Sequence, residues 1–297
     1  MIVKKTVCFS NLCQLHTRQK QLVIKKEDQQ DKTIPIEDIG FLILDHYGIT
    51  ISHTTLAVML ENNVAVITTD STHMPVGLFL PLSGNTVQGE RFREQIKASV
   101  PLKKQAWKQI VTSKVTNQSK TLENFGLQNN VIKRLITKIL SGDTSNVEAQ
   151  AAKIYWTILF DPINFKRYRY GKPPNNLLNY GYAILRAVVA RALVGTGLLP
   201  SLGIHHHNRY NAYPLADDVM EPYRPFVDEI VWNIAMNEYD ISDITTELKM
   251  ELLSIPNLPV KLEGETVSLM SAVSRTTASL YQFLSHKTKK LVLPTCG

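Results

Sequence analysis

The stretch YGYAILRAVVARALVGTGLL, Tyr180–Leu199, is the longest apolar run of the chain and decides the fold of its larger part. Arg186 and Arg191 interrupt it, and two arginines are costly in the hydrocarbon core of a bilayer. The run is therefore predicted to be a buried helix of a globular core. No membrane partner is expected.

Segments with apolar residues at helical spacing lie on both sides of this run, between Arg91 and residue 286. They are RFREQIKAS, LKKQAWKQIVTSK, NNVIKRLITKIL, NVEAQAAKIYWTILF, FVDEIVWNIAMNEY, ITTELKMELLSI and TVSLMSAVSRTTASLYQFL. This pattern predicts a larger all-α C-terminal domain over residues 91–286. Residues 287–297 are basic and contain a proline, and they are predicted to form an exposed C-terminal tail.

Up to Leu82 the apolar residues instead form short runs, rich in Val, Ile, Thr and Phe, between turn signals. The runs are VKKTVCFS, LVIKK, IGFLILD, ITI, VAVITT and PVGLFLPL. They predict a small β-strand-rich N-terminal domain over residues 1–82, with one helix in a βαβ-like passage from Ile49 to Asp70. Residues 83–90 have the composition of a linker, so the predicted fold class is α+β.

The charge balance bounds the possible partners. Lys and Arg number 33 against 26 Asp and Glu, a net charge of +7 that suits a polyanionic partner without requiring one. Three cysteines, Cys8, Cys13 and Cys296, form no metal-ligand pattern and no even-numbered disulfide framework. The start MIVKKTVCFSNLCQ has no apolar core of signal-peptide length, so a cytoplasmic protein is expected.

The densest polar cluster lies between Leu202 and Glu229. Its histidines and carboxylates are His205, His206, His207, Asp217, Asp218 and Glu221. Imidazole and carboxylate groups together form a donor set for Mg²⁺, Mn²⁺ or a transition metal. A helix that starts near Pro214 would place Asp218 and Glu221 on one face. A solvated histidine run followed by helix-capping aspartates explains the same residues, and the local sequence leaves both interpretations open.

Glu148, in SNVEAQAAKIYWTILF, is a second candidate because it lies at the edge of a predicted apolar helix face. A glutamate in the first turn also stabilises the helix dipole, with Ser145 or Asn146 as the N-cap. From these residues alone, a structural role is the simpler interpretation.

A basic segment with interleaved aromatic residues is the third candidate. Lys166, Arg167 and Arg169 alternate with Tyr168 and Tyr170, which supplies cations for phosphates and rings for stacking on bases. A solvated basic turn is the alternative. Further cations, among them Lys103 and Lys104, place most of the positive charge in the helical half.

These segments together resemble the CRISPR-associated protein one family, the integrases that insert new spacers into CRISPR arrays. The resemblance rests on NVEAQAAKIYW, on PPNNLLNYGYAILRAVVARALVGTGLLPSLGIHHH and on LADDVMEPYRPFVD. The family pattern has a glutamate near the start of one helix and a histidine three residues after the glycine of a Leu-Gly loop. An N-x-LLNYGY-like helix and a D-x-M-E motif complete it. The strand-rich half is also similar to the family's N-terminal domain.

The resemblance implies a set of catalytic and metal-binding residues: Glu148, His206 and Glu221, which would hold Mg²⁺ or Mn²⁺. Asp218 would support them, while His205 or His207 could take the place of His206. In this family the 3′-hydroxyl of incoming DNA attacks a repeat phosphodiester, and water in its place nicks DNA. The expected protein is thus a metal-dependent DNA integrase and endonuclease with an all-α catalytic domain.

The resemblance also implies partners. These are protospacer and CRISPR repeat DNA, a second copy of the chain bound through the N-terminal domain, and a dimer of a small second CRISPR-associated protein in a heterohexamer. The wording DDVMEPYRPFVD is most similar to type II systems, in which the effector nuclease helps to select DNA. Two other functions remain open: a repair or RNA nuclease that uses water as the nucleophile, and a non-catalytic nucleic-acid-binding scaffold.

Overall fold

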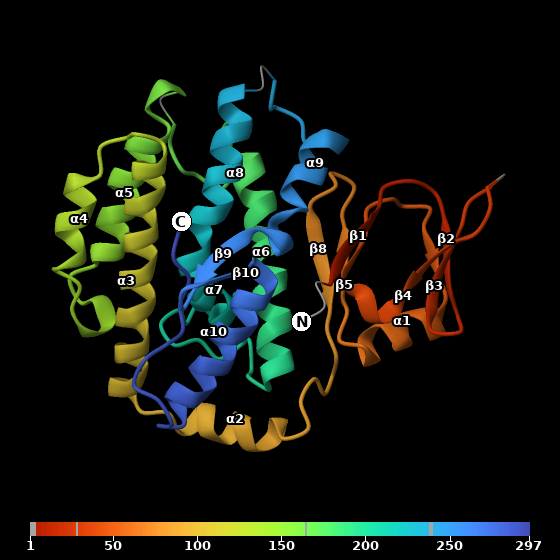
Figure 1. Ribbon diagram of the computed structural model, residues 1–297, viewed down its shortest axis with the longest axis horizontal. Coiled ribbons are helices and arrows are strands. Elements are labelled where there is room, and N and C mark those ends of the chain that lie inside the picture. Colours follow the sequence, from red (N-terminus) through yellow and green to blue (C-terminus); the bar gives the residue numbers. More distant parts are fainter. Residues whose placement is uncertain (1–3, 28, 164, 238–239) are drawn as a thin grey trace. The chain divides into compact units, whose positions relative to one another are not determined.

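The chain divides after Thr86 into a strand-rich unit, Met1–Thr86, and a helical unit, Val87–Gly297. The structure is a computed structural model, and it describes residues 4–27, 29–163, 165–237 and 240–297 (Figure 1). The division lies inside the segment 83–90 that the sequence assigns to a linker. Helix α2 already begins within that segment, at Gln88.

The strand-rich unit contains two four-stranded sheets. The first has the order β1 (Lys5–Phe9), β5 (Ile39–Leu44), β7 (Ala65–Thr69) and β8 (Pro75–Phe79), with β8 antiparallel and the others parallel. The second has the order β4 (Lys32–Pro35), β3 (Gln21–Lys25), β2 (Gln14–Arg18) and β6 (Thr50–Ile51). A short 3₁₀ turn, η1 (Ile36–Asp38), precedes β5.

Helix α1 (His53–Glu61) packs on both sheets, because it contacts β2 in one and β7 in the other. The apolar core joins the same three layers and includes Leu15, Leu22, Ile39, Leu42, Met59 and Val66. The strands on either side of α1, β6 and β7, belong to different sheets. The predicted order of strand, helix and strand between Ile49 and Asp70 is therefore confirmed, but α1 connects two sheets instead of crossing over one.

The helical unit contains nine α-helices in its described part. They are α2 (Gln88–Lys97), α3 (Val100–Asn124), α4 (Asn130–Ile136), α5 (Val147–Leu159), α6 (Asn175–Thr196), α7 (Pro214–Met220), α8 (Arg224–Asn237), α9 (Thr246–Leu252) and α10 (Leu269–Leu284). Four 3₁₀ turns connect them: η2 (Ser141–Asp143), η3 (Asp161–Ile163), η4 (Glu221–Tyr223) and η5 (Ile255–Asn257).

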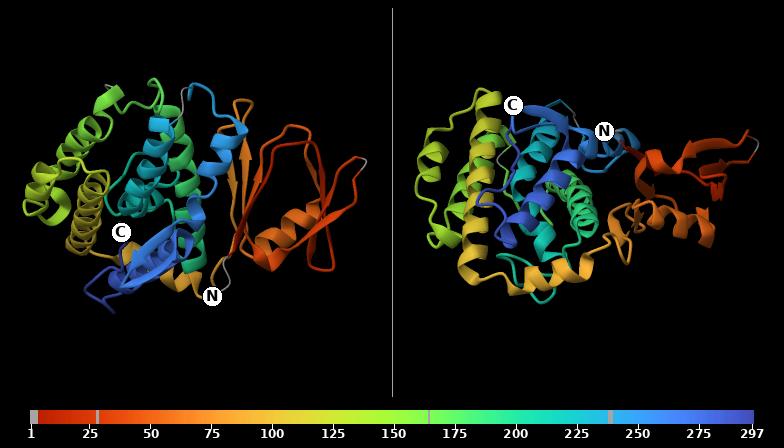
Figure 2. Two further views of the ribbon diagram at one scale, coloured as in Figure 1. Left: turned by 45° about the horizontal axis from the view of Figure 1, so that its top comes forward. Right: turned by 60° about the horizontal axis from the view of Figure 1, so that its bottom comes forward.

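Helix α6 is the core helix that the longest apolar run predicts. It packs against α8 and α10, and Figure 2 shows these three helices side by side in both views. A Cβ atom at Gly181 would lie 2.6 Å from Cγ1 of Val227, so only glycine permits this approach of α6 to α8. The length and composition of α6 would suit a membrane span, but 78% of the most apolar window of this helix is buried within the protein.

The helical unit is not all-α as predicted, because it contains a β-hairpin. Strands β9 (Pro259–Leu262) and β10 (Glu265–Ser268) pair antiparallel around Glu263 and Gly264, whose φ angles are 51° and 87°. Val260 and Leu262 are buried, while Pro259 and Lys261 are exposed. Each strand has only four residues, too few for its alternation to be distinguished from the neighbouring helical patterns.

The predicted exposed tail is exposed only at its basic beginning. Lys287, Lys289 and Lys290 are exposed, whereas Pro294 and Cys296 are buried. The backbone N–H of Thr295 donates to the carbonyl of Lys261 at 2.9 Å and so extends the hairpin by one bridge. Apolar side chains and paired backbone groups hold the chain end on the helical unit.

Candidate active site

Asp218 of α7 organises the histidine loop that precedes this helix. Its fully buried carboxylate accepts hydrogen bonds from the backbone N–H groups of Ile204 (2.6 Å), His205 (2.9 Å) and His206 (3.2 Å). One of its oxygens also lies 2.6 Å from Nδ1 of His206. This hydrogen bond raises the pKa of His206, although burial opposes the shift. Asp218 thus fixes both the loop and the ring of His206.

Gly203 gives this loop the space to turn. A Cβ atom there would lie 2.3 Å from the carbonyl oxygen of His206 and 3.2 Å from Oδ2 of Asp218. We predict that Gly203→Ala lowers the free energy of unfolding by about 1–3 kcal/mol, because backbone and a buried carboxylate must move. Chemical denaturation measures this. Gly89→Ala is the control, since a Cβ at Gly89 meets nothing within 4 Å; equal stabilities of the two variants would contradict the prediction.

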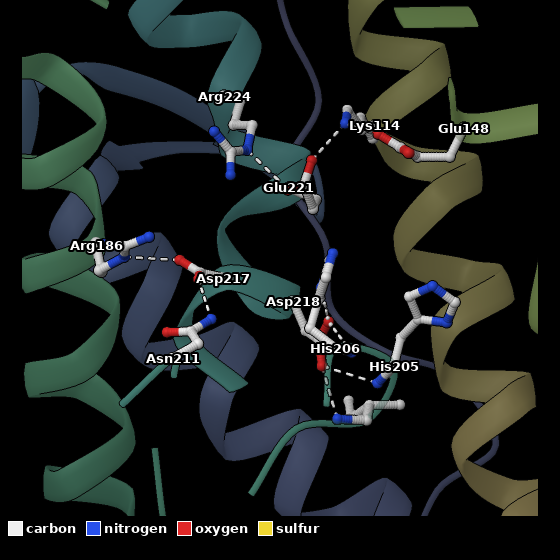
Figure 3. A network of polar contacts seen from close by, with 11 residues as sticks. Lys114, Glu148, Arg186, His205, His206, Asn211, Asp217, Asp218, Glu221 and Arg224 are labelled. Atoms are coloured by element: carbon white, nitrogen blue, oxygen red, sulfur yellow. Dashed lines mark hydrogen bonds and ion pairs between the residues drawn. The ribbon is translucent and has the colours of Figure 1, made fainter. Parts of the chain in front are cut away.

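The three histidines have different surroundings. The ring of His205 stacks on Trp107 of α3 at 4.2 Å between centroids. Partial burial lowers the pKa of His205, and the nearby His206 lowers it further. His207 is exposed. The ring of His206 meets Trp107 edge-on and points toward Glu221 (Figure 3). Of the two rings drawn there, that of His206 is therefore the one that faces Glu221.

Lys114 of α3 joins the two glutamates that the sequence selects. Its ammonium forms ion pairs with Glu148 of α5 and with Glu221 of η4 (Figure 3). The side chains of Lys114 and Glu221 are each only 7% exposed, and Nε of Arg224 lies 2.8 Å from the second oxygen of Glu221. Two carboxylates from distant segments thus converge on one buried cation.

The pKa values follow from this pairing. Burial disfavours the charged form of Glu221, but Arg224 and Lys114 outweigh it and lower the pKa of this carboxyl to about 2. Burial likewise disfavours the ammonium of Lys114, and the two glutamates outweigh it and raise its pKa. The Glu221 carboxyl is therefore ionised at neutral pH.

Asp143 in η2 positions Glu148. Its carboxylate accepts hydrogen bonds from the N–H groups of Val147 and Glu148, both at 2.9 Å. Asn146 has a left-handed φ of 51°, and its side chain makes no capping hydrogen bond. Asn146 is thus the N-cap residue, one of the two that the sequence offered, but Asp143 accepts the hydrogen bonds from the first N–H groups of α5 in its place. Glu148 itself is directed to Lys114.

Asp217 faces away from this pair of glutamates. Its carboxylate accepts hydrogen bonds from Nε of Arg186 and from Nδ2 of Asn211, both at 2.7 Å (Figure 3). Asp218 is likewise occupied by the histidine loop. The face expected from the sequence holds Asp218 and Glu221. Helix α7 ends at Met220, so Glu221 lies in η4, and the two carboxylates have different partners.

The glutamates and His206 supply oxygen and nitrogen donors of the kind that bind divalent cations. Within the described residues no group of three or more His, Cys, Asp or Glu side chains is close enough to hold a metal ion. Lys114 lies between Glu148 and Glu221 instead. Oε2 of Glu221 is buried and faces Lys114, while Oε1 pairs with Arg224. Two carboxylates that share one cation beside an imidazole are a suitable donor set for Mg²⁺ or Mn²⁺.

The expected DNA-binding residues differ in exposure. Lys166, Arg169 and Lys104 are exposed, and Lys103 is half-buried. Arg167 instead donates to Oδ1 of Asn175 at 2.8 Å and to Oδ1 of Asn179 at 2.9 Å, both on α6. Arg167 thus holds the basic loop against the first turns of α6, which the sequence did not predict.

A buried carboxylate on α8 predicts a dependence of stability on pH. Asp228 accepts hydrogen bonds from the hydroxyls of Tyr155 and Tyr182, yet burial raises its pKa to about 7. Because the folded protein holds the proton of Asp228 more tightly than the unfolded chain does, this residue's contribution to stability is full below about pH 4. The contribution is lost as the pH rises through about 7. We predict that Asp228→Asn removes on the order of 2–4 kcal/mol of this pH-dependent loss. Urea denaturation at pH 4–8 tests this, with exposed Asp243→Asn as the control; an unchanged slope in Asp228→Asn would contradict it.

The protein thus belongs to the class of two-unit α+β proteins. Its helical unit carries a site in which two glutamates share a buried lysine beside a histidine. Within this class the chain belongs to the CRISPR associated protein Cas1 family, whose model matches residues 7–254. It is 32% identical over 293 residues to the CRISPR-associated endonuclease Cas1 of Neisseria meningitidis serogroup C (strain 8013), which covers 98% of this chain and 95% of that protein.

Two solved structures share the fold. A casposase bound to integration product is 18% identical, with a TM-score of 0.78 over 98% of this chain and 92% of that one. A chain of a Cas6-RT-Cas1–Cas2 complex is 19% identical, with a TM-score of 0.74 over 97% of this chain and 35% of that one. At these identities the likeness concerns the fold alone.

Proposed function

We propose that this protein is a metal-dependent DNA integrase and endonuclease of CRISPR adaptation that inserts new spacers into the CRISPR array. The observation that carries the proposal is the convergence of Glu148 and Glu221 on one buried cation, with His206 directed toward Glu221. Membership of the Cas1 family supports it, as does the fold shared with a casposase.

Glu148, His206 and Glu221 are the residues that would hold Mg²⁺ or Mn²⁺, which when bound neutralises the phosphate and activates the attacking oxygen. Asp218 binds Nδ1 of His206, which leaves Nε2 of that ring for the site. Arg224 keeps Glu221 ionised.

In the proposed reaction the 3′-hydroxyl of the incoming DNA attacks a repeat phosphorus. The new 3′-oxygen to phosphorus bond forms as the old one breaks, the nucleophile loses its proton, and the repeat strand leaves with a free 3′-hydroxyl. Water as the nucleophile would give a nick by the same displacement. The exposed cations Lys166, Arg169 and Lys104, with Lys103, are proposed to bind DNA phosphates.

The proposed partners are protospacer and repeat DNA, a second copy of this chain bound through the strand-rich unit, and a dimer of Cas2 in a heterohexamer. The similar fold in a Cas6-RT-Cas1–Cas2 complex supports the choice of Cas2. A type II effector nuclease as a further partner and a cytoplasmic location belong to the same proposal.

A strand-joining assay tests this function. A short duplex with free 3′-hydroxyls is incubated with a supercoiled plasmid that carries a CRISPR repeat, with Cas2 and Mg²⁺ or Mn²⁺. The expected product is plasmid covalently joined to the duplex, and EDTA is expected to abolish it. Hydrolysis without joining would favour a nuclease that uses water, and binding without either product would favour a non-catalytic scaffold.

A further inference from the structure

The end of the chain, Leu291–Gly297, lies along helix α3, and the label C in Figure 1 marks its position beside this helix. We call this segment the strap. Residues of α3 at successive turns bind its backbone. Oε1 of Gln109 accepts from the N–H of Leu291 at 2.9 Å, and Oγ of Ser113 donates to the carbonyl of Pro294 at 3.2 Å. The strap is thus fixed in register on the helix that carries Lys114.

Asn117, one turn further along α3, connects the strap to the turn that contains Glu221. Its Oδ1 accepts from the N–H of Cys296 at 3.1 Å, and its Nδ2 donates to the carbonyls of Pro294 (3.1 Å) and Pro222 (2.8 Å). Pro222 follows Glu221 directly in η4. The side chain of Asn117 is buried, so the strap fixes the orientation of its amide.

Thr276 of α10 makes a second, independent connection. Its hydroxyl donates to the carbonyl of Val292 in the strap at 2.7 Å. The hydroxyl of Tyr223 lies 2.7 Å from Oγ1 of Thr276. Because Thr276 has one proton to donate, Tyr223 is the donor in the second bond. Tyr223 is the last residue of η4 and is buried.

We infer that the strap is a positioning element for Glu221. The two residues that follow this glutamate, Pro222 and Tyr223, are both connected to the strap by hydrogen bonds. Asn117 makes the connection for Pro222, and Thr276 makes it for Tyr223. The two connections approach η4 from α3 and from α10, so they restrict the turn from two directions. The inference rests on the proposed function, because it assigns Glu221 a role that requires exact placement.

Removal of each connection tests the inference. Asn117→Ala and Thr276→Val are each expected to lower kcat for strand joining about 10-fold, as outer-shell substitutions do, with KM for DNA changed less than about twofold. Thr276→Ser keeps the hydroxyl and is expected to restore kcat. Gln109→Ala and Ser113→Ala each remove one contact of the strap with α3 but leave Asn117 and Thr276 in place, so each is expected to lower kcat less than about twofold. Equal losses in the control pair and the test pair would overturn the inference.

Two further measurements separate the strap from the proposed function. Hydrogen exchange of the peptide that contains Glu221 needs no activity, and it is expected to accelerate in Asn117→Ala and Thr276→Val but not in Ser113→Ala. A full chain shortened to end at Leu293 loses the Pro294 and Cys296 contacts and is expected to reproduce Asn117→Ala. Wild-type values of kcat and of hydrogen exchange in that shortened protein would overturn the role of the strap. If the wild type joins no strands but the variants still exchange faster than the wild type, only the proposed function is overturned.

Discussion

Glu148→Gln is expected to reduce strand joining on the order of 10³-fold while the protein stays folded and binds DNA. The amide that replaces the carboxylate carries no charge, so it cannot share with Glu221 the neutralisation of a divalent cation. The fold is preserved because Asp143 still caps α5 and Glu221 still pairs with Lys114 and Arg224. Single-turnover joining at saturating DNA measures the loss, and fluorescence anisotropy measures DNA affinity.

Glu123→Gln is the matched control for this substitution. Glu123 lies on α3 and pairs with Lys133 at 3.3 Å, but its side chain is 60% exposed, and exposed pairs contribute little. Its joining rate is expected to equal that of the wild type. Undiminished joining by Glu148→Gln would remove Glu148 from the catalytic residues and leave its pairing with Lys114 as a structural feature.

The long helices could be predicted from the sequence because many apolar residues at one spacing contribute to each. The run Tyr180–Leu199 gave α6 within a few residues of its bounds. Strand β2 (Gln14–Arg18) was missed, since its polar side chains on a two-sided sheet leave only Leu15 fully buried. The separation of β6 and β7 into two sheets was also missed, because pairing partners are set by tertiary contacts that no local pattern contains.

The residues of the candidate site divide in the same way. Family resemblance selects Glu148, His206 and Glu221, and the structure directs these three toward one region. The resemblance could not select Lys114. This residue is one of several lysines on α3, and its partner Glu148 lies 34 residues away in the sequence. The role of Asp143 was not predicted for a similar reason. Its side chain caps α5 from four residues before the helix, outside the usual capping position.

Lys114→Met is expected to lower the free energy of unfolding of the metal-free protein by about 3–5 kcal/mol at neutral pH, as breaking other buried ion pairs does. Without the ammonium, Glu148 has no ionic partner from α3 and Glu221 retains only Arg224. In the wild type the pKa of Glu221 is held at about 2, so this group stabilises the fold above its unfolded pKa near 4 and ceases to do so as the pH falls toward 2. The difference between variant and wild type is therefore greatest at neutral pH and narrows below about pH 4.

The same substitution distinguishes competition from cooperation between Lys114 and the proposed metal. If a divalent cation takes the place of the ammonium between Glu148 and Glu221, Mn²⁺ must displace Lys114 in the wild type but meets two unneutralised carboxylates in Lys114→Met. Mn²⁺ is then expected to raise the Tm of the variant by more than that of the wild type, since ligand binding stabilises in proportion to affinity. Lys108→Met, on the same helix, controls for the loss of a lysine, and EDTA reverses the metal effect. A smaller Mn²⁺ shift in Lys114→Met than in the wild type would mean that the lysine supports metal binding and keeps its place in the loaded site.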